Sequence, residues 1–204
     1  MKIKLKNIKA FTLVELLVSI AIFALMTALL VAKYGNFNQS ILLNNLAYDI
    51  ALNIRSAQSY GLNVRGVASS GGNPSEFKYP FGVRFINNNN NFILFADIDA
   101  DGFYDTGETI LSTVTIKSVA SIDSLCVTNN NSCSGTVNSL NITFKRPDPN
   151  AIIRGNSDSN NMGMAEIVIK STDGSKKKIV IRSNGQIGVE NVISQDSNTN
   201  SQAE

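Results

Sequence analysis

The sequence predicts an α+β protein, in which one long N-terminal helix is followed by a mostly antiparallel β head. The first observation is an apolar run from Phe11 to Ala32, in which Glu15 is the only charged residue before the lysine that ends the run. The second is a helical spacing of apolar residues that continues to about residue 62. The third is a series of short apolar segments after residue 80, separated by turn-forming residues. A helix followed by a run of strands is typical of the α+β class.

The apolar run has the length of a membrane-spanning helix, which needs about 20 residues. Four lysines lie within residues 1–10, and such a basic flank stays on the cytoplasmic side. A cleaved secretory signal or a plain anchor would account for these two features. However, the small residue Ala10 precedes the run, whereas a signal peptide carries its small-residue cleavage site after it. Glu15 is also unusual, because an acid in a membrane helix costs about 2.5–3.5 kcal/mol on insertion scales and is usually paired. A position at the interface, with the carboxylate near the headgroups, is the alternative for Glu15.

Beyond the membrane segment, apolar residues recur near a 3.6-residue period, which predicts that the helix continues. These residues are Leu43, Leu46, Ala47, Ile50, Ala51, Ile54, Ala57 and Leu62. Gly61 marks an end, so we expect one helix over residues 11–62, with 11–32 in the membrane. The alternative is two helices with a loop between Gly35 and Ser40, because glycine disfavours a helix interior by about 1 kcal/mol.

The head is expected over residues 63–193, followed by a polar tail, 194–204, that is predicted to be disordered. Segments 81–86 and 92–96 flank a run of asparagines, which predicts a hairpin. Further strands are expected over 109–119, 124–127, 140–144, 165–170, 177–182 and 186–192. Residues 150–163 are predicted to form an exposed loop, and 172–175 a turn between two strands.

Composition argues against several functions. The chain has no histidine, which removes histidine-based catalysis and histidine metal ligation. Without residues 1–10, it holds 14 basic and 16 acidic residues, so there is no basic excess for nucleic acid. No pairing of a nucleophile with a base stands out. We therefore expect a protein that is not an enzyme.

The stretch 9–17, with the sequence KAFTLVELL, and the apolar run after it resemble the class III signal of type IV pilins and type II secretion pseudopilins. The resemblance implies that a prepilin peptidase cuts between Ala10 and Phe11, and that Phe11 is then N-methylated. It also implies that Glu15, at the fifth position of the mature chain, pairs with the terminal amine of a neighbouring subunit. Ala10 departs from the family, in which glycine is usual, so processing is expected at lower efficiency.

Three short segments narrow the resemblance to the GspH/FimT group of minor pseudopilins and minor pilins. They are 54–58 (IRSAQ), 142–148 (ITFKRPD) and 178–185 (KIVIRSNG). The group implies a pilin-like fold and an initiating or tip role in a filament. We therefore expect a GspH-like minor pseudopilin, a structural subunit of a type II secretion pseudopilus. The alternatives are a FimT-like minor type IV pilin for adhesion or DNA uptake and, from another class, a single-pass membrane enzyme or ligand-binding ectodomain.

The same resemblance implies a location and partners. We expect a single pass through the cytoplasmic (inner) membrane with the head outside the cytoplasm, and an extracytoplasmic filament after assembly. The expected partners are prepilin peptidase, other pilins or pseudopilins that contact the N-terminal helix, and the inner-membrane assembly platform. Nucleic acid is not an expected partner.

Residues 97–108 have the acid spacing of an EF-hand calcium loop, with glycine at the sixth position. The candidate ligands are the carboxylates of Asp97, Asp99, Asp101, Asp105 and Glu108 and the carbonyl of Phe103. Carboxylates suit Ca²⁺, which prefers six to eight hard oxygen ligands. The stretch follows a predicted strand rather than a helix, so an acidic turn without metal is the alternative. No cofactor is required elsewhere in the chain, and Ca²⁺ is the one candidate.

Cys126 and Cys133 are the only cysteines. If the head lies outside the cytoplasm, a disulfide between them is expected, and two free thiols are the alternative.

Residues 176–178 are three consecutive lysines, and Arg182 follows them. Some FimT-type minor pilins bind DNA through a C-terminal Gly-Arg-x-Arg element. The matching stretch here, 185–188, reads GQIG and lacks both arginines. We expect the lysines to form a solvated strand edge that discourages aggregation.

Overall fold

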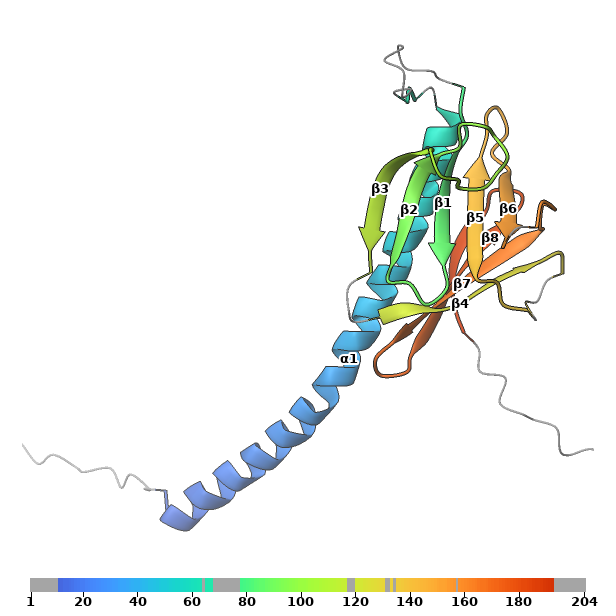
Figure 1. Cartoon of the computed structure of the whole chain (residues 1–204). Coiled ribbons are helices and arrows are strands. Elements are labelled where there is room, and N and C mark those ends of the chain that lie inside the picture. The colour runs from blue at the N-terminus through green and yellow to red at the C-terminus, as the bar shows by residue number, and fades with distance from the viewer. Residues whose placement is uncertain are drawn as a thin grey trace, which may run out of the picture. The chain divides into compact units, whose positions relative to one another are not determined.

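A computed structural model describes residues 11–63, 65–67, 78–116, 120–130, 133, 135–156 and 158–192, apart from the side chains of 32–38. The expected leader 1–10, which includes Ala10, and the expected disordered tail 194–204 lie outside these residues. The described chain forms one long helix followed by nine strands, which is the predicted α+β layout (Figure 1). The chain divides into two units, Met1–Asn38 and Gln39–Glu204. All buried side chains of the described residues belong to the second unit.

Helix α1 runs from Leu13 to Leu62, which supports the single-helix prediction over two helices. The predicted apolar face is buried in the second unit, with Leu43, Ala47, Ile50, Ala51, Ile54 and Ala57 at 2% exposure or less. Near its end the helix passes close to a strand. A Cβ atom at Gly61 would collide with the carbonyl oxygen of Phe144, so glycine is needed there for close packing.

The head consists of two antiparallel sheets. The first has the order β3-β2-β1-β5-β6 and the second the order β4-β7-β8-β9. The strands are β1 (Phe81–Ile86), β2 (Asn91–Ala96), β3 (Thr109–Thr115), β4 (Ala120–Thr128), β5 (Ser139–Phe144), β6 (Ala151–Gly155), β7 (Met164–Ser171), β8 (Lys176–Arg182) and β9 (Ile187–Asn191). The predicted hairpin across the asparagine run is present as β1 and β2, with Phe85 opposite Phe92.

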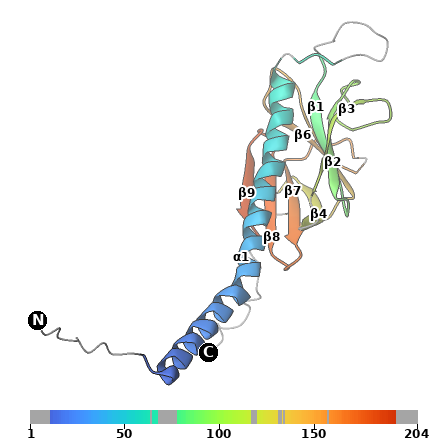
Figure 2. The same ribbon diagram turned by 90° about the vertical axis from the view of Figure 1, so that its left-hand side faces the viewer.

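The core lies between the second half of α1 and the two sheets. Figure 2 shows this half of the helix in front of the sheets, with β9 on one side and β1 on the other. Alternate strand residues face it, because successive side chains in a strand point to opposite faces. Its members on the strands include Val83, Phe85, Leu94, Leu140, Ile142, Phe144, Ile167, Ile169, Ile179 and Ile181.

Two strand predictions were wrong. Residues 151–155, predicted within an exposed loop, form β6, which pairs with β5 and buries Ala151 and Ile153. Its few apolar residues are followed by a polar stretch, which hid the strand. The segment predicted as one strand over 109–119 ends at Thr115, and β4 begins at Ala120 instead of at residue 124. The register of β4 shifts between Ile122 and Ser124, and this irregularity masks its alternation.

The expectation that the lysine run forms a strand edge was also wrong. The run belongs to β8, which lies between β7 and β9 and is therefore an interior strand. Lys176 pairs with Asp123 of β4 at 2.7 Å. Lys178 pairs with Glu166 of β7 at 3.1 Å and with Glu190 of β9 at 3.3 Å. Acids on the same face of the sheet, which sequence spacing does not reveal, thus neutralise much of this basic run.

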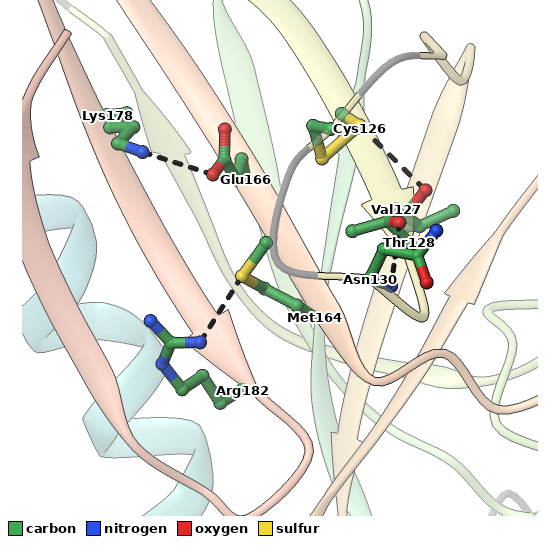
Figure 3. Close-up of a disulfide and its surroundings, with 9 residues drawn as sticks. Cys126, Val127, Thr128, Asn130, Met164, Glu166, Lys178 and Arg182 are labelled. Carbon is green, nitrogen blue, oxygen red and sulfur yellow. Dashed lines mark hydrogen bonds and ion pairs between the residues drawn. A yellow bond between two sulfur atoms is a disulfide. The ribbon is translucent and has the colours of Figure 1, made fainter. Parts of the chain in front are cut away.

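The predicted disulfide between Cys126 and Cys133 is formed, with the two Cα atoms 6.0 Å apart. Cys126 lies near the end of β4, opposite Glu166 of β7 (Figure 3). Just beyond it the chain turns, and the Asn130 N–H donates to Thr128 Oγ1 at 3.0 Å. The disulfide therefore closes a short loop at one end of the second sheet.

Replacing both cysteines with alanine is expected to lower the free energy of unfolding of the 39–204 unit by about 2–3 kcal/mol, because the unfolded chain loses the loop constraint. Urea denaturation followed by circular dichroism measures this change. Reductant should destabilise the wild-type unit and leave the double variant unchanged. A wild-type unit that is equally stable with and without reductant would contradict the prediction.

Candidate assembly helix and candidate cation site

Helix α1 begins with a capping box made by Thr12 and Glu15. The Glu15 N–H donates to Thr12 Oγ1 at 3.2 Å, and the Thr12 N–H donates to Glu15 Oε2 at 3.4 Å. Such a box satisfies N–H groups that have no partner within the helix. Glu15 was predicted as a functional residue from its charge, and this second role was not predicted. The Thr-x-x-Glu spacing before an apolar run was the available signal.

The segment Leu13–Val31 is long and apolar enough to cross a membrane, with a mean hydropathy of 2.5. Its side chains are exposed in the isolated subunit. The two hydroxyl side chains within it donate to the helix backbone: Ser19 to Glu15 O at 2.7 Å and Thr27 to Phe23 O at 2.5 Å. These bonds spare both hydroxyls the cost of an unsatisfied donor in an apolar environment. The segment therefore presents an apolar surface that suits lipid or the helices of neighbouring subunits.

The Glu15 carboxylate remains available for a further partner. Both of its contacts with Thr12 use the same oxygen, Oε2. A carboxylate has about four acceptor positions, so Oε1 can accept bonds from a cation. Pairing with a neighbour's terminal amine is thus compatible with the capping box.

In the head, the acidic loop 97–108 connects β2 to β3. The last residue pair of that hairpin is Ala96 opposite Thr109. Asp97 directly follows Ala96 along the chain, and Glu108 directly precedes Thr109. The register of the hairpin therefore brings together the first and last positions of the predicted calcium loop, although the flanking elements are strands and not helices.

The loop gathers all five predicted carboxylates. Oxygens of Asp97, Asp99 and Glu108 lie within 4.8 Å of one another, and so do oxygens of Asp99, Asp101 and Asp105. Asp99 belongs to both groups. Two ligands of one Ca²⁺ ion, each 2.3–2.6 Å from it, lie at most about 5 Å apart. Either group could therefore contact a single ion. The carbonyl of Phe103 as a sixth ligand stays a prediction.

Asp97 is the buried member of the cluster, with 1% of its surface exposed. Its Oδ2 accepts the Gly102 N–H at 3.0 Å, whereas its Oδ1 has no hydrogen-bond partner among the described residues. Burial raises the pKa of Asp97 to about 6, and the Gly102 bond opposes the rise. Burial likewise raises the pKa of Glu108 to about 7, opposed by the N–H groups of Asp105 and Ile98.

Two arginines that were not predicted as site residues hold the loop against the first sheet. Arg84 of β1 donates to the carbonyl of Tyr104 at 3.0 Å, and its guanidinium lies 5.3 Å from the Tyr104 ring. Arg154 of β6 lies 5.1 Å from the Phe103 ring. A polar cleft of about 290 Å³ lies beside the loop, lined in part by Arg84, Tyr104 and Asn141. Arg84 is a charged residue in an otherwise apolar strand, at a position that alternates with the core-facing residues Val83 and Phe85. This position was the available sequence signal.

Two of the segments that carry the family resemblance meet: 54–58, which lies on α1, and 178–185, which covers the end of β8 and the turn after it. Gln58 Nε2 donates to the carbonyl oxygens of Pro149 and Gly185, each at 3.1 Å. Gly185 has a φ of 82°, and a Cβ there would collide with the Pro149 carbonyl oxygen. Arg55 donates to Ile187 O at 3.0 Å. Segments 54–58 and 178–185 thus form one junction, with the end of segment 142–148 one residue away from Pro149.

The fold and the N-terminal helix define a class of protein with an apolar, exposed helix and a mostly antiparallel β head. Within this chain, residues 5–31 match the family model described as the prokaryotic N-terminal methylation motif. This match supports a type IV pilin-like protein. It implies processing by prepilin peptidase and pilin-type assembly, and with the apolar helix it supports a single-pass, membrane-anchored protein. No curated protein and no solved structure matches the chain.

Proposed function

We propose that the chain is a minor pseudopilin of the GspH type, a structural and non-enzymatic subunit of a type II secretion pseudopilus. The observation that carries the proposal is the methylation motif at residues 5–31, which lies at the start of an exposed apolar helix that continues into a β-rich head. In this role the subunit is inserted in the cytoplasmic membrane, is cleaved before Phe11 and is then extracted into a filament. The apolar segment then exchanges lipid for the helices of other subunits.

The head supports a minor, GspH/FimT-type subunit through the junction of Gln58, Pro149 and Gly185. These contacts join two of the segments on which that resemblance depends. A DNA-uptake role is less well supported, because 185–188 lacks both arginines of the Gly-Arg-x-Arg element and two of the three lysines, Lys176 and Lys178, are paired with acids. The minor type IV pilin is therefore kept as an outcome of the test.

The test is to delete the gene in the source bacterium, and to purify the filaments that contain an epitope-tagged copy of the chain. We expect secreted enzymes to accumulate inside the deletion strain, and mass spectrometry to find the chain with other pseudopilins. Normal secretion combined with loss of surface pili would assign the chain to a type IV pilus instead. A mature chain that keeps residues 1–10 would overturn both assignments.

A further inference from the structure

We propose that the loop 97–108 is a calcium site in which Asp97, Asp99, Asp101, Asp105 and Glu108 are ligands. The site lies in the head and does not depend on the proposed function. The acidic spacing alone would not establish it, because Asp- and Gly-rich turns between strands are common and bind no metal. The structure adds a second observation of a different kind.

That observation is the unpartnered oxygen of Asp97. Asp97 is buried, and its Oδ1 has no hydrogen-bond partner among the described residues, although its Oδ2 accepts the Gly102 N–H. A buried polar atom without a partner is destabilising, and more so when it is charged. An ion that fills the space between Asp97, Asp99 and Glu108 would contact such an oxygen.

The loop backbone is already arranged around the carboxylates. The N–H groups of Asp101 and Phe103 donate to Asp99 Oδ1 and Asp101 Oδ1, at 3.3 and 2.8 Å. Glu108 accepts the N–H groups of Ile98 and Asp105, one on each oxygen. Every carboxylate oxygen has two lone pairs, so these bonds leave acceptor capacity for an ion. Gly102 has a φ of 86°, which permits the tight turn between Asp101 and Asp105.

The number of carboxylates favours Ca²⁺ over Mg²⁺. Mg²⁺ keeps several waters and usually takes one or two carboxylates in a strict octahedron, whereas Ca²⁺ accepts six to eight oxygens in flexible geometry. Each of the two groups on this short loop brings three carboxylates together, which is more than Mg²⁺ usually takes and suits Ca²⁺. The carboxylates also repel one another when no cation is present.

Calcium would also fix the loop against the first sheet. Phe103 and Tyr104 lie between the acids, and they contact Arg154 and Arg84 on strands β6 and β1. Repulsion among the acids would loosen these contacts in the metal-free protein. We therefore expect calcium to raise the melting temperature of the protein and not merely to occupy its surface.

The experiment uses the full-length protein in detergent micelles, with calorimetry and thermal melts in CaCl₂, MgCl₂ or chelator. Extracellular calcium modules bind with a Kd of about 10⁻⁴–10⁻³ M, and we expect this range. The melting temperature should rise in millimolar Ca²⁺ and rise less in equal Mg²⁺. Identical melts in Ca²⁺ and chelator, with no heat of binding, would overturn the proposal, and an equal rise in Mg²⁺ would overturn the assignment to calcium.

Asp99→Asn is the test variant, because Asp99 is exposed and belongs to both groups of acids. It should weaken calcium binding by about tenfold or more, since affinity follows the charge of the ligands. Asp173→Asn is the matched control. Asp173 also accepts the N–H two residues ahead, from Ser175, but lies in the separate 172–175 turn. If Asp99→Asn does not fold, the exposed Asp105→Asn replaces it. Calcium binding that survives in the folded loop variant, or that is lost in Asp173→Asn, would overturn the proposal.

Discussion

An Ala10→Asp variant is expected to keep residues 1–10, so that no mature chain accumulates. A prepilin-type signal places a small residue immediately before the apolar run, and Ala10 is that residue here. A charged side chain at this position removes the small residue that the peptidase requires. Mass spectrometry of the membrane-extracted wild-type protein should find a chain that begins with methylated Phe11, and the variant should begin at Met1.

Ala10→Gly is the matched control, because glycine is usual at this position in pilins and pseudopilins. It should be processed at least as completely as the wild-type chain. A wild-type protein that begins at Met1, or one cut after Ala32, would contradict the pilin-type signal. In the first case the match at residues 5–31 would reflect a plain anchor, and in the second case a cleaved secretory signal.

The long helix α1 and the meeting of the two ends of the acidic loop 97–108 were predictable, because local sequence spacing determines both. The 3.6-residue period from Leu43 to Ala57 appears unchanged as the buried face of α1. Asp97 and Glu108 meet because the β2–β3 hairpin closes at Ala96 and Thr109, and the sequence places both strands beside the acids. In each case one contiguous stretch contains all the information that the structure uses.

Features that depend on pairing between distant segments were not predictable. β6 is a strand because β5 offers it hydrogen bonds, and not because of its own five residues. The lysines of β8 do not lie on an edge strand, because β9 pairs with the free side of β8. Two of them form ion pairs with Asp123, Glu166 and Glu190, which are distant in the sequence. The orphan oxygen of Asp97 depends on burial, which spacing cannot reveal.

A Glu15→Ala variant is expected to be processed and to fold, but to be nearly absent from filaments. We expect Glu15 to pair with the terminal amine of a neighbouring subunit in the apolar centre of the filament. Removing one partner of a buried ion pair costs about 3–5 kcal/mol, because the other charge stays buried and unpaired. Incorporation should therefore fall by roughly 100-fold or more, since each 1.4 kcal/mol corresponds to a factor of ten. Immunoblots of sheared filaments against total membrane protein measure this ratio.

The capping box makes Glu15→Ala ambiguous, because alanine removes both the charge and the bond to the Thr12 N–H. Two further variants separate these effects. Glu15→Gln keeps an acceptor suited to the capping box but removes the charge. Thr12→Val removes the hydroxyl that caps the Glu15 N–H but keeps the charge. We expect Glu15→Gln to be excluded from filaments and Thr12→Val, once mass spectrometry shows that it is processed, to enter them. The opposite result would mean that Glu15 acts by starting the helix and not by pairing with its neighbour.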